Sequence, residues 1–124
     1  MKYVGSLKDY LYFNLTGKWL IDHSAASVSG LYNNKVMDWD EEIVSYAGIK
    51  REMLSPIVGE THQEMLTVEL AKILQLESPL PVIIGATDGV LVNVGIGAVK
   101  PGEMSVTIGT SGAVRMLTIS QRAS

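Results

Sequence analysis

The chain has 124 residues, the size of one ordinary domain, and a net charge of −3, which gives no electrostatic reason to expect nucleic acid or a membrane as a partner. It is 47% hydrophobic and 19% charged, which predicts a folded core rather than disorder. The absence of cysteine excludes disulfides and thiolate metal sites, and the spacing of His23 and His62 predicts no metal site. No apolar run suits a membrane helix or a signal peptide, so we expect a cytoplasmic protein.

The first part of the chain, up to about Pro81, has mainly helical patterns. Apolar spacing predicts a helix over residues 7–15, with Gly17 as a left-handed cap at its end. The predicted buried stripe of this helix comprises Leu7, Tyr10, Leu11 and Leu15. A second short helix is expected to begin at residues 22–24, where several side chains can act as the N-cap.

Three further helical segments follow. The acidic run 38–42 is typical of the first turn of a helix, where the helix dipole favours negative charge, and residues 30–34 are predicted as a turn before it. Residues 51–54 form a short helical turn before Pro56, and residues 64–76 have the clearest helical pattern.

The second part of the chain is rich in glycine and β-branched residues. A buried strand is predicted over residues 82–84, and two strands over 104–108 and 113–119 flank a turn. Residues 89–97 fit either a strand, by alternation, or a helix with Asp88 at its N-terminal end. The sequence therefore predicts a mixed α/β fold.

Asp88 is a candidate general base. A lone carboxylate after an apolar strand can accept the proton of a hydroxyl that attacks a phosphoryl group. The alternative is that Asp88 caps a helix beginning at Gly89, with help from Thr87, and capping aspartates are much commoner than catalytic ones.

The segment Gly109-Thr110-Ser111-Gly112 is a candidate phosphate site. Glycines let a backbone approach a ligand, and the two hydroxyls can donate to phosphate oxygens. The alternative is a plain hairpin loop of small residues. The segment is not a Walker A loop, because neither a lysine nor a helix-forming run follows it.

Other polar and aromatic residues have simpler structural explanations. His23 could be a ligand or base, but packing beside a helix cap is the commoner role. Trp19 and Trp39 could stack on a sugar, although core or rim packing is commoner. The carboxylates of residues 38–42 resemble a cation site, but charge at a helix N-terminus explains them more simply.

Taken in order, these motifs resemble the FGGY family of carbohydrate kinases, which includes glycerol, xylulose and gluconate kinases. The resemblance covers about Lys2 to Thr118. The matching segments are Tyr10-Leu11, Leu15-Thr16-Gly17, Asp22-His23-Ser24-Ala25-Ala26-Ser27, Trp39-Asp40, Gly48-Ile49, Met53-Leu54, Pro56, Gly85-Ala86-Thr87-Asp88-Gly89, Gly95, Gly97, Lys100-Pro101-Gly102 and Gly109-Thr110-Ser111-Gly112.

The resemblance implies a ribonuclease H-like, actin-like ATPase fold. Residues 1–100 would be the later part of a sugar-binding N-terminal domain, and residues 101–124 the first hairpin of a nucleotide-binding C-terminal domain. It also implies Asp88 as catalytic base and substrate contact, beside Gly89. Nucleotide phosphate would meet Gly109, Thr110 and Ser111, although some members have glycine where this chain has Ser111.

The same resemblance implies ATP and Mg²⁺, and a sugar or sugar acid as the small-molecule substrate. The sequence around Asp88 and Thr110 is most similar to that of bacterial gluconate kinases. A small Gly89 would leave room for a long acidic substrate. Xylulose kinase remains an alternative. The family's early phosphate hairpin and C-terminal nucleotide region have no counterpart in these residues. We therefore expect a fragment that is inactive alone and self-associates through uncovered strand edges.

The rival interpretation is a non-catalytic binding module of the actin-like type. In that case the Gly109–Gly112 hairpin would hold phosphate and Asp88 would be a helix cap. Only a kinase would lose rate on Asp88→Asn, by about 10²–10⁴-fold for a lost general base.

Overall fold

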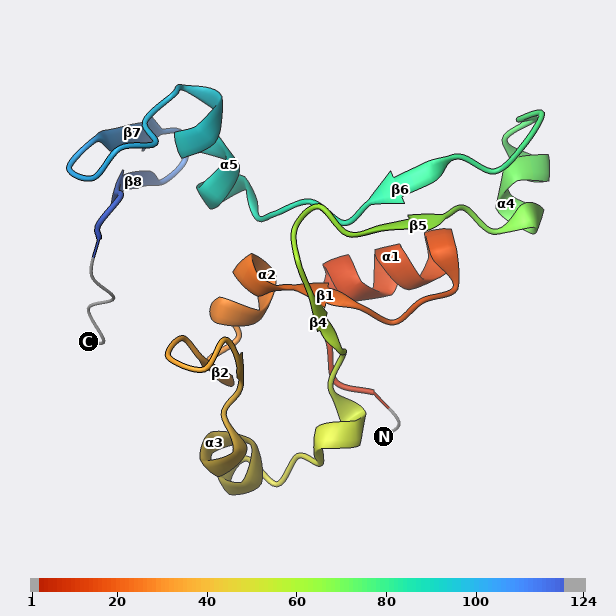
Figure 1. Ribbon diagram of the computed structural model, residues 1–124, viewed down its shortest axis with the longest axis horizontal. Coiled ribbons are helices and arrows are strands. Elements are labelled where there is room, and N and C mark those ends of the chain that lie inside the picture. The colour runs from red at the N-terminus through yellow and green to blue at the C-terminus, as the bar shows by residue number, and fades with distance from the viewer. Residues whose placement is uncertain (1–2, 120–124) are drawn as a thin grey trace. The chain divides into compact units, whose positions relative to one another are not determined.

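The computed structural model describes residues 3–119, and its contacts divide the chain into two compact units, residues 1–85 and 86–124 (Figure 1). The described helices of the first unit are α1 (Leu7–Thr16), α2 (His23–Ser27), α3 (Glu41–Tyr46), the 3₁₀ helix η1 (Arg51–Met53) and α4 (Val68–Ile73). Its described strands are β1 (Ile21–Asp22), β2 (Tyr32–Asn33), β3 (Asp38–Trp39), β4 (Ile57–Val58), β5 (Gln63–Met65) and β6 (Pro81–Ile83). The second unit contains α5 (Asp88–Gly95), β7 (Met104–Ile108) and β8 (Gly112–Met116).

The strands pair two by two in the described part of the chain. β1 and β4 are parallel, whereas β2–β3, β5–β6 and β7–β8 are antiparallel. Within the first unit, α1 lies along the β5–β6 pair (Figure 1), where the Tyr12 hydroxyl donates to the Val82 carbonyl at 3.2 Å. Since each pair has two strands, every described strand keeps one edge without a sheet partner, which small sheets seldom tolerate alone.

The buried core lies in the first unit, around the β1–β4 pair. It is formed by Ile21, Ala25, Ala26, Tyr32, Trp39, Val44 and Leu54. Trp39 is 4% exposed, and its indole N–H donates to the Ser55 carbonyl at 3.0 Å. Burying the larger side chains of this cluster, such as Ile21, Val44 and Leu54, contributes about 1.5–3 kcal/mol each.

Helix α1 has the predicted ends but buries a different face. Gly17 caps it in the left-handed conformation at φ 73°, as predicted. The predicted stripe is wrong, because Leu7 is 73% exposed while the buried residues are Asp9, Tyr12 and Thr16. The polar face can be buried because Asp9 accepts hydrogen bonds from the Ser6 and Ser55 hydroxyls, and Ser55 lies 46 residues away.

The helices α3 and α4 are shorter than predicted. Residues 38 and 39 belong to β3, which pairs with β2 inside the segment predicted as a turn, and α3 begins only after its N-cap Asp40. Likewise, residues 63–65 form β5 rather than the first turn of a helix. In both places a partner strand supplies backbone hydrogen bonds that a local pattern cannot reveal.

The later part of the chain is closer to prediction. Residues 88–95 are helical, which resolves the ambiguity in favour of α5, and β7 and β8 form the predicted hairpin. The strand over 82–84 exists but is not buried throughout, since Ile83 is 62% exposed and Ile84 is 6% exposed. Among residues 3–119, no helix is long and apolar enough to cross a membrane.

The compact units do not follow the predicted domain boundary. The contacts divide the chain after Gly85, whereas the predicted boundary follows Lys100. Helix α5 groups with β7 because the two elements touch. Contact grouping and domain membership are different divisions, so the boundary after Lys100 remains a prediction.

Candidate functional site

Asp88 is the first residue of α5 and is exposed. Thr87 occupies the N-cap position, with extended backbone angles, so Asp88 is not the cap itself. The Asp88 carboxylate Oδ1 accepts the Gly89 amide N–H at 2.7 Å. Its Oδ2 has no protein hydrogen-bond partner within residues 3–119, which leaves one carboxylate oxygen available to a ligand.

The hairpin strand β7 holds α5. The Ser105 hydroxyl, in a residue only 1% exposed, donates to Asn93 Oδ1 on α5. This bond ties the helix that begins at Asp88 to the strand that leads into Gly109. The candidate base and the candidate phosphate loop therefore belong to one compact unit.

Residues 109–111 form the exposed loop of the β7–β8 hairpin. The Gly109 amide is not free, because it donates to the Ser111 carbonyl at 2.9 Å. The side chains of Thr110 and Ser111 have no hydrogen-bond partner in the described chain. At Gly109 and Gly112 φ is not positive, and an added Cβ would find its nearest neighbour at 4.0 Å and 3.8 Å. Neither strain nor crowding requires these glycines.

Arg115 on β8 is a residue that the sequence analysis missed. Its Nη1 donates to Thr107 Oγ1 at 3.0 Å. A Cβ placed on Gly89 would lie 3.0 Å from Arg115 Nε and 3.4 Å from Nη2. The space that a glycine at position 89 creates is thus faced by a guanidinium. Strand alternation could have revealed this, because Arg115 pairs with Ser105, whose side chain reaches α5.

The other sequence candidates have structural roles in the first unit. His23 follows the α2 cap Asp22, and its Nδ1 lies 2.8 Å from the Tyr32 hydroxyl. Trp39 is a core residue, as described above. Trp19 packs against Tyr3 and Phe13, with ring centroids 5.0 Å and 5.6 Å away. Packing therefore explains all three, in line with the commoner roles.

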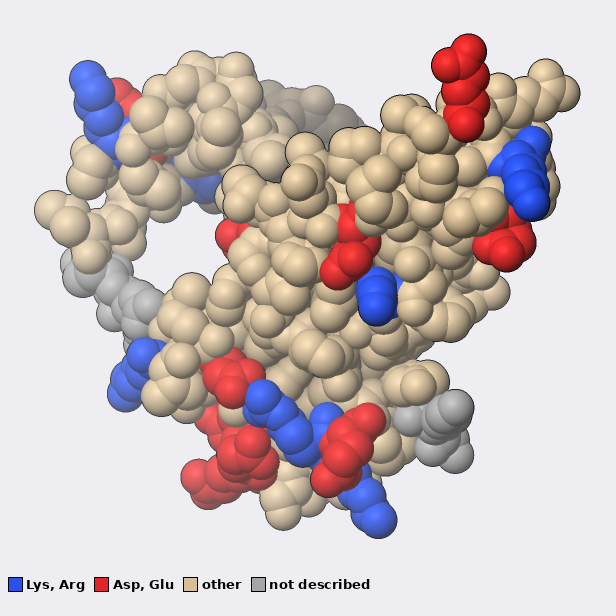
Figure 2. Space-filling view, turned by 45° about the vertical axis from the view of Figure 1, so that its right-hand side comes forward, with Lys and Arg blue, Asp and Glu red and all other residues tan. Residues whose placement is uncertain are grey.

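Three carboxylates of the acidic run 38–42, those of Asp38, Asp40 and Glu41, have partners within the protein. The Asp40 carboxylate accepts the amides of Glu42 and Ile43, both at 3.1 Å. Arg51 pairs with Asp38 at 2.8 Å and with Glu41 at 3.3 Å, and Figure 2 shows mixed charges on this part of the first unit. Within residues 3–119, no group of three or more histidine, cysteine or acidic side chains is arranged to hold a metal ion.

Asp22 is a buried carboxylate with cationic and hydroxyl partners. It is 0% exposed, caps α2 through the Ala25 amide at 3.1 Å, and accepts hydrogen bonds from Lys8 and Ser24. Burial acts to raise the pKa of Asp22, but the bonds from Lys8, Ser24 and Ala25 outweigh it, and the pKa is lowered. Lys8 Nζ also donates to the Gly85 carbonyl at 3.1 Å, so helix α1 is hydrogen-bonded to the last residue of the first unit.

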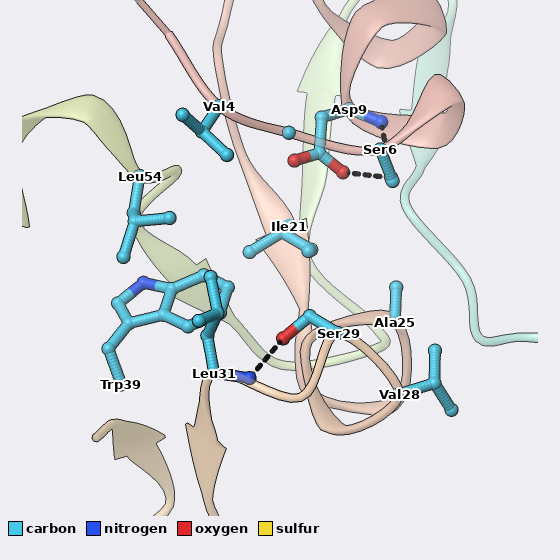
Figure 3. Close-up of a pocket in the computed structure, with 11 residues that line it drawn as sticks. Val4, Ser6, Asp9, Ile21, Ala25, Val28, Ser29, Leu31, Trp39 and Leu54 are labelled. Carbon is cyan, nitrogen blue, oxygen red and sulfur yellow. Dashed lines mark hydrogen bonds between the residues drawn. The ribbon is translucent and has the colours of Figure 1, made fainter. Parts of the chain in front are cut away.

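A hollow of about 360 Å³ opens in the first unit, but it contains none of the predicted site residues (Figure 3). Its walls are mainly apolar core residues, including Ile21, Trp39 and Leu54. Asp9 is the one ionisable residue of this lining, and its carboxylate accepts hydrogen bonds from the Ser6 and Ser55 hydroxyls. The lining is therefore mostly apolar, and Ser6, Asp9 and Ser29 supply its polar side chains.

Comparison with known proteins shows the family. Residues 1–95 match the N-terminal domain of the FGGY family of carbohydrate kinases, and the chain belongs to this family. It is 44% identical over 117 residues to the gluconokinase of Bacillus subtilis (strain 168), covering 94% of this chain and 23% of that protein.

Solved structures agree with this assignment. The xylulose kinase of Lactobacillus acidophilus has a TM-score of 0.88 at 34% identity, covering 93% of this chain and 24% of that one. The gluconate kinase of the same species has a TM-score of 0.83 at 35% identity, covering 88% and 22%. The predicted family and the α/β, actin-like fold of sugar kinases are confirmed, and the chain spans less than a quarter of these relatives.

Proposed function

We propose that this chain is part of an ATP-dependent kinase that phosphorylates a hydroxyl of a sugar acid, with gluconate as substrate and 6-phosphogluconate as product. The main support is that Asp88 has one carboxylate oxygen without a protein partner among residues 3–119. Asp88 also begins a helix that is hydrogen-bonded to β7, the strand that leads into the candidate phosphate loop. The 44% identity to a gluconokinase supports the choice of substrate. The 124 residues alone are expected to be inactive, since the relatives are several times longer.

Asp88 acts as the general base in this proposal. The substrate hydroxyl gives its proton to Asp88 Oδ2 as the hydroxyl oxygen bonds to the γ-phosphorus of ATP. The bond from the γ-phosphorus to its bridging oxygen breaks, and ADP leaves with that electron pair. The Gly89 amide holds Oδ1 at 2.7 Å, which fixes the carboxylate while Oδ2 faces the substrate.

The loop residues Gly109, Thr110 and Ser111 contact the nucleotide phosphates. The exposed hydroxyls of Thr110 and Ser111 supply donors, and the missing side chain of Gly109 lets phosphate approach the backbone. The Gly109 amide is already bonded within the loop, so the hydroxyls and the other amides carry the binding. Residues 101–124 would thereby open the nucleotide-binding domain and residues 1–100 would belong to the sugar-binding domain.

The described residues do not fit the Mg²⁺ that the family implies. Among residues 3–119 no group of three or more histidine, cysteine or acidic side chains is arranged to hold a metal ion, and Asp88 is the one acidic residue in the candidate site. We therefore derive no step through the metal from this chain.

Xylulose is the second candidate substrate, because the xylulose kinase structure has a TM-score of 0.88 to this chain. A sugar acid differs from xylulose by its negative charge, and Arg115 supplies a positive charge beside Gly89. The positive charge favours the sugar acid.

A substrate comparison with the full-length protein tests the proposal. ATP consumption is measured with gluconate, xylulose and glycerol, and the phosphorylated product is identified by mass spectrometry. We expect the highest kcat/KM with gluconate. ATP binding without turnover on any polyol or sugar acid would instead support a non-catalytic nucleotide-binding module.

A further inference from the structure

Arg115 is a half-buried residue without a counter-ion among residues 3–119. Arg115 forms no ion pair with any carboxylate in residues 3–119, and its one protein hydrogen bond there joins Nη1 to Thr107. An arginine held in place without an acidic partner retains most of its donors for an anion from outside.

Gly89 and Thr107 fix the position of the Arg115 guanidinium. A Cβ added to Gly89 would lie 3.0 Å from Nε and 3.4 Å from Nη2, so this edge packs against the backbone of Gly89, where only a glycine leaves room for it. Thr107 accepts a hydrogen bond from Nη1 on the opposite side. The N–H groups of Nη1 and Nη2 that these two residues do not engage are left for a carboxylate.

The charges of this unit point in the same direction. Between Ala86 and Ile119 the sequence has two cationic residues, Lys100 and Arg115. Lys100 lies in the exposed turn before β7, whereas Arg115 contacts the residue next to Asp88. Among residues 86–119, Arg115 is therefore the cation that a substrate bound at Asp88 would meet.

We propose that Arg115 is a specificity-determining residue that binds the carboxylate of a sugar acid and so distinguishes it from neutral sugars and polyols. This inference rests on the proposed function, since it gives a role to Arg115 in the site of Asp88. The ligand chemistry is a planar oxyanion attached to a polyhydroxy chain.

The test uses the full-length protein, with D-gluconate and D-gluconamide as probes. The two compounds share a carbon chain and a planar end group, but gluconamide carries no charge. In Arg115→Met, which keeps the length of the side chain and removes its charge, KM for gluconate should rise roughly 10- to 100-fold, the loss expected for charge-assisted hydrogen bonds. KM for gluconamide and kcat with either probe should change little. Arg115→Lys keeps the positive charge but cannot form two parallel hydrogen bonds with a carboxylate. Its KM for gluconate should lie between those of the wild type and Arg115→Met.

Gly89→Ala is a second variant that does not depend on the folding of the Arg115 variants. The added methyl group would stand 3.0 Å from Nε, so the guanidinium would have to shift by a few tenths of an ångström, while alanine suits a helix better than glycine. We expect unchanged or higher thermal stability together with a raised KM for gluconate. Thr107→Val removes the hydrogen-bond acceptor of Arg115 Nη1. It should therefore also raise KM for gluconate relative to KM for gluconamide.

The outcomes separate this inference from the proposed function. If the wild-type protein phosphorylates neither probe, the proposed function fails. If the wild type is active and Arg115→Met loses kcat equally on both probes, Arg115 acts on the transferred phosphoryl group and the carboxylate assignment is wrong. Unchanged selectivity in Arg115→Met would also overturn the assignment while leaving the kinase intact.

Discussion

The buried Ser105 hydroxyl on β7 donates a partly buried hydrogen bond to Asn93 on α5. This pair links the helix that begins with Asp88 to the strand that ends before Gly109. The predicted domain boundary after Lys100 passes between the two residues. The pair is therefore one of the contacts that join the proposed base and the proposed phosphate loop within one unit.

Ser105→Ala should lower both stability and catalytic rate. The substitution leaves the partly buried Asn93 Oδ1 without its donor, at a cost of about 0.5–1.5 kcal/mol. We expect a lower melting temperature and a reduced kcat in the full-length protein. Ser45→Ala, at an exposed position on α3, is the matched control and should be neutral. An unchanged melting temperature in Ser105→Ala would show that the bond does not hold the unit together.

Thr110→Val should weaken ATP binding specifically. The hydroxyl of Thr110 is exposed and unbonded within residues 3–119, so its proposed partner is a nucleotide phosphate. Loss of a hydrogen bond to a charged group costs about 1.5–3 kcal/mol, equivalent to about a tenfold or greater rise in KM for ATP. KM for the sugar acid should stay the same. Thr61→Val, an exposed threonine of the first unit, serves as control, and equal effects of both variants would refute the phosphate role.

The Asp22–Lys8 pair predicts a loss of stability in acid. Because the folded pKa of Asp22 lies below its unfolded value of about 3.9, the stabilising contribution is fully present above about pH 4 and is lost as the pH falls through the folded pKa. Asp22→Asn should therefore lower the melting temperature at neutral pH, and its difference from wild type should shrink below about pH 4.

Asp38→Asn is the control for this pH dependence. Asp38 also pairs with a cation, Arg51, but its side chain is 47% exposed, and exposed ion pairs contribute about 0–1 kcal/mol. The control should change the melting temperature little at any pH. A difference between Asp22→Asn and wild type that stays constant from pH 2.5 to 7 would contradict the assignment.

The isolated 124-residue chain should self-associate. Leu7, Tyr10 and Leu11 on α1 are 73%, 55% and 54% exposed, and each described strand pair has uncovered edges. Exposed apolar surface and open edges favour association between copies. Sedimentation velocity of the purified chain over a range of concentrations measures this. A monomer at all concentrations would contradict it.

Local patterns predicted the end of α1 and the start of α2, because a cap depends on neighbouring residues, but they missed the N-caps of α3 and α4, Asp40 and Thr67. Gly17, Asp22 and the Gly109–Gly112 turn all lie where the sequence indicates. The buried face of α1 could not be predicted, because Asp9 is satisfied by Ser55 from a distant segment. For the same reason β5 was mistaken for helix, since its partner β6 follows only after α4.

The candidate site residues that belong to local sequence motifs could be proposed from the sequence, whereas the one that depends on a long-range contact could not. Asp88 and Thr110 carry recognisable motifs, and those motifs follow one another in the order typical of the family. Arg115 lies in an ordinary strand pattern, and its significance depends on a contact with Gly89 that only the fold creates. The polar roles of Lys8 and Asp22 likewise depend on packing, because helix α1 brings Lys8 to the cap of α2.

The most direct test of the account is the turnover rate of Asp88→Asn in the full-length protein, measured with saturating ATP and gluconate. Asparagine keeps the size of the side chain and its bond to the Gly89 amide but cannot accept the proton. We predict a fall in kcat of about 10²–10⁴-fold with nearly unchanged ATP binding by calorimetry. A variant that retains the wild-type kcat would contradict the role of Asp88 as the base.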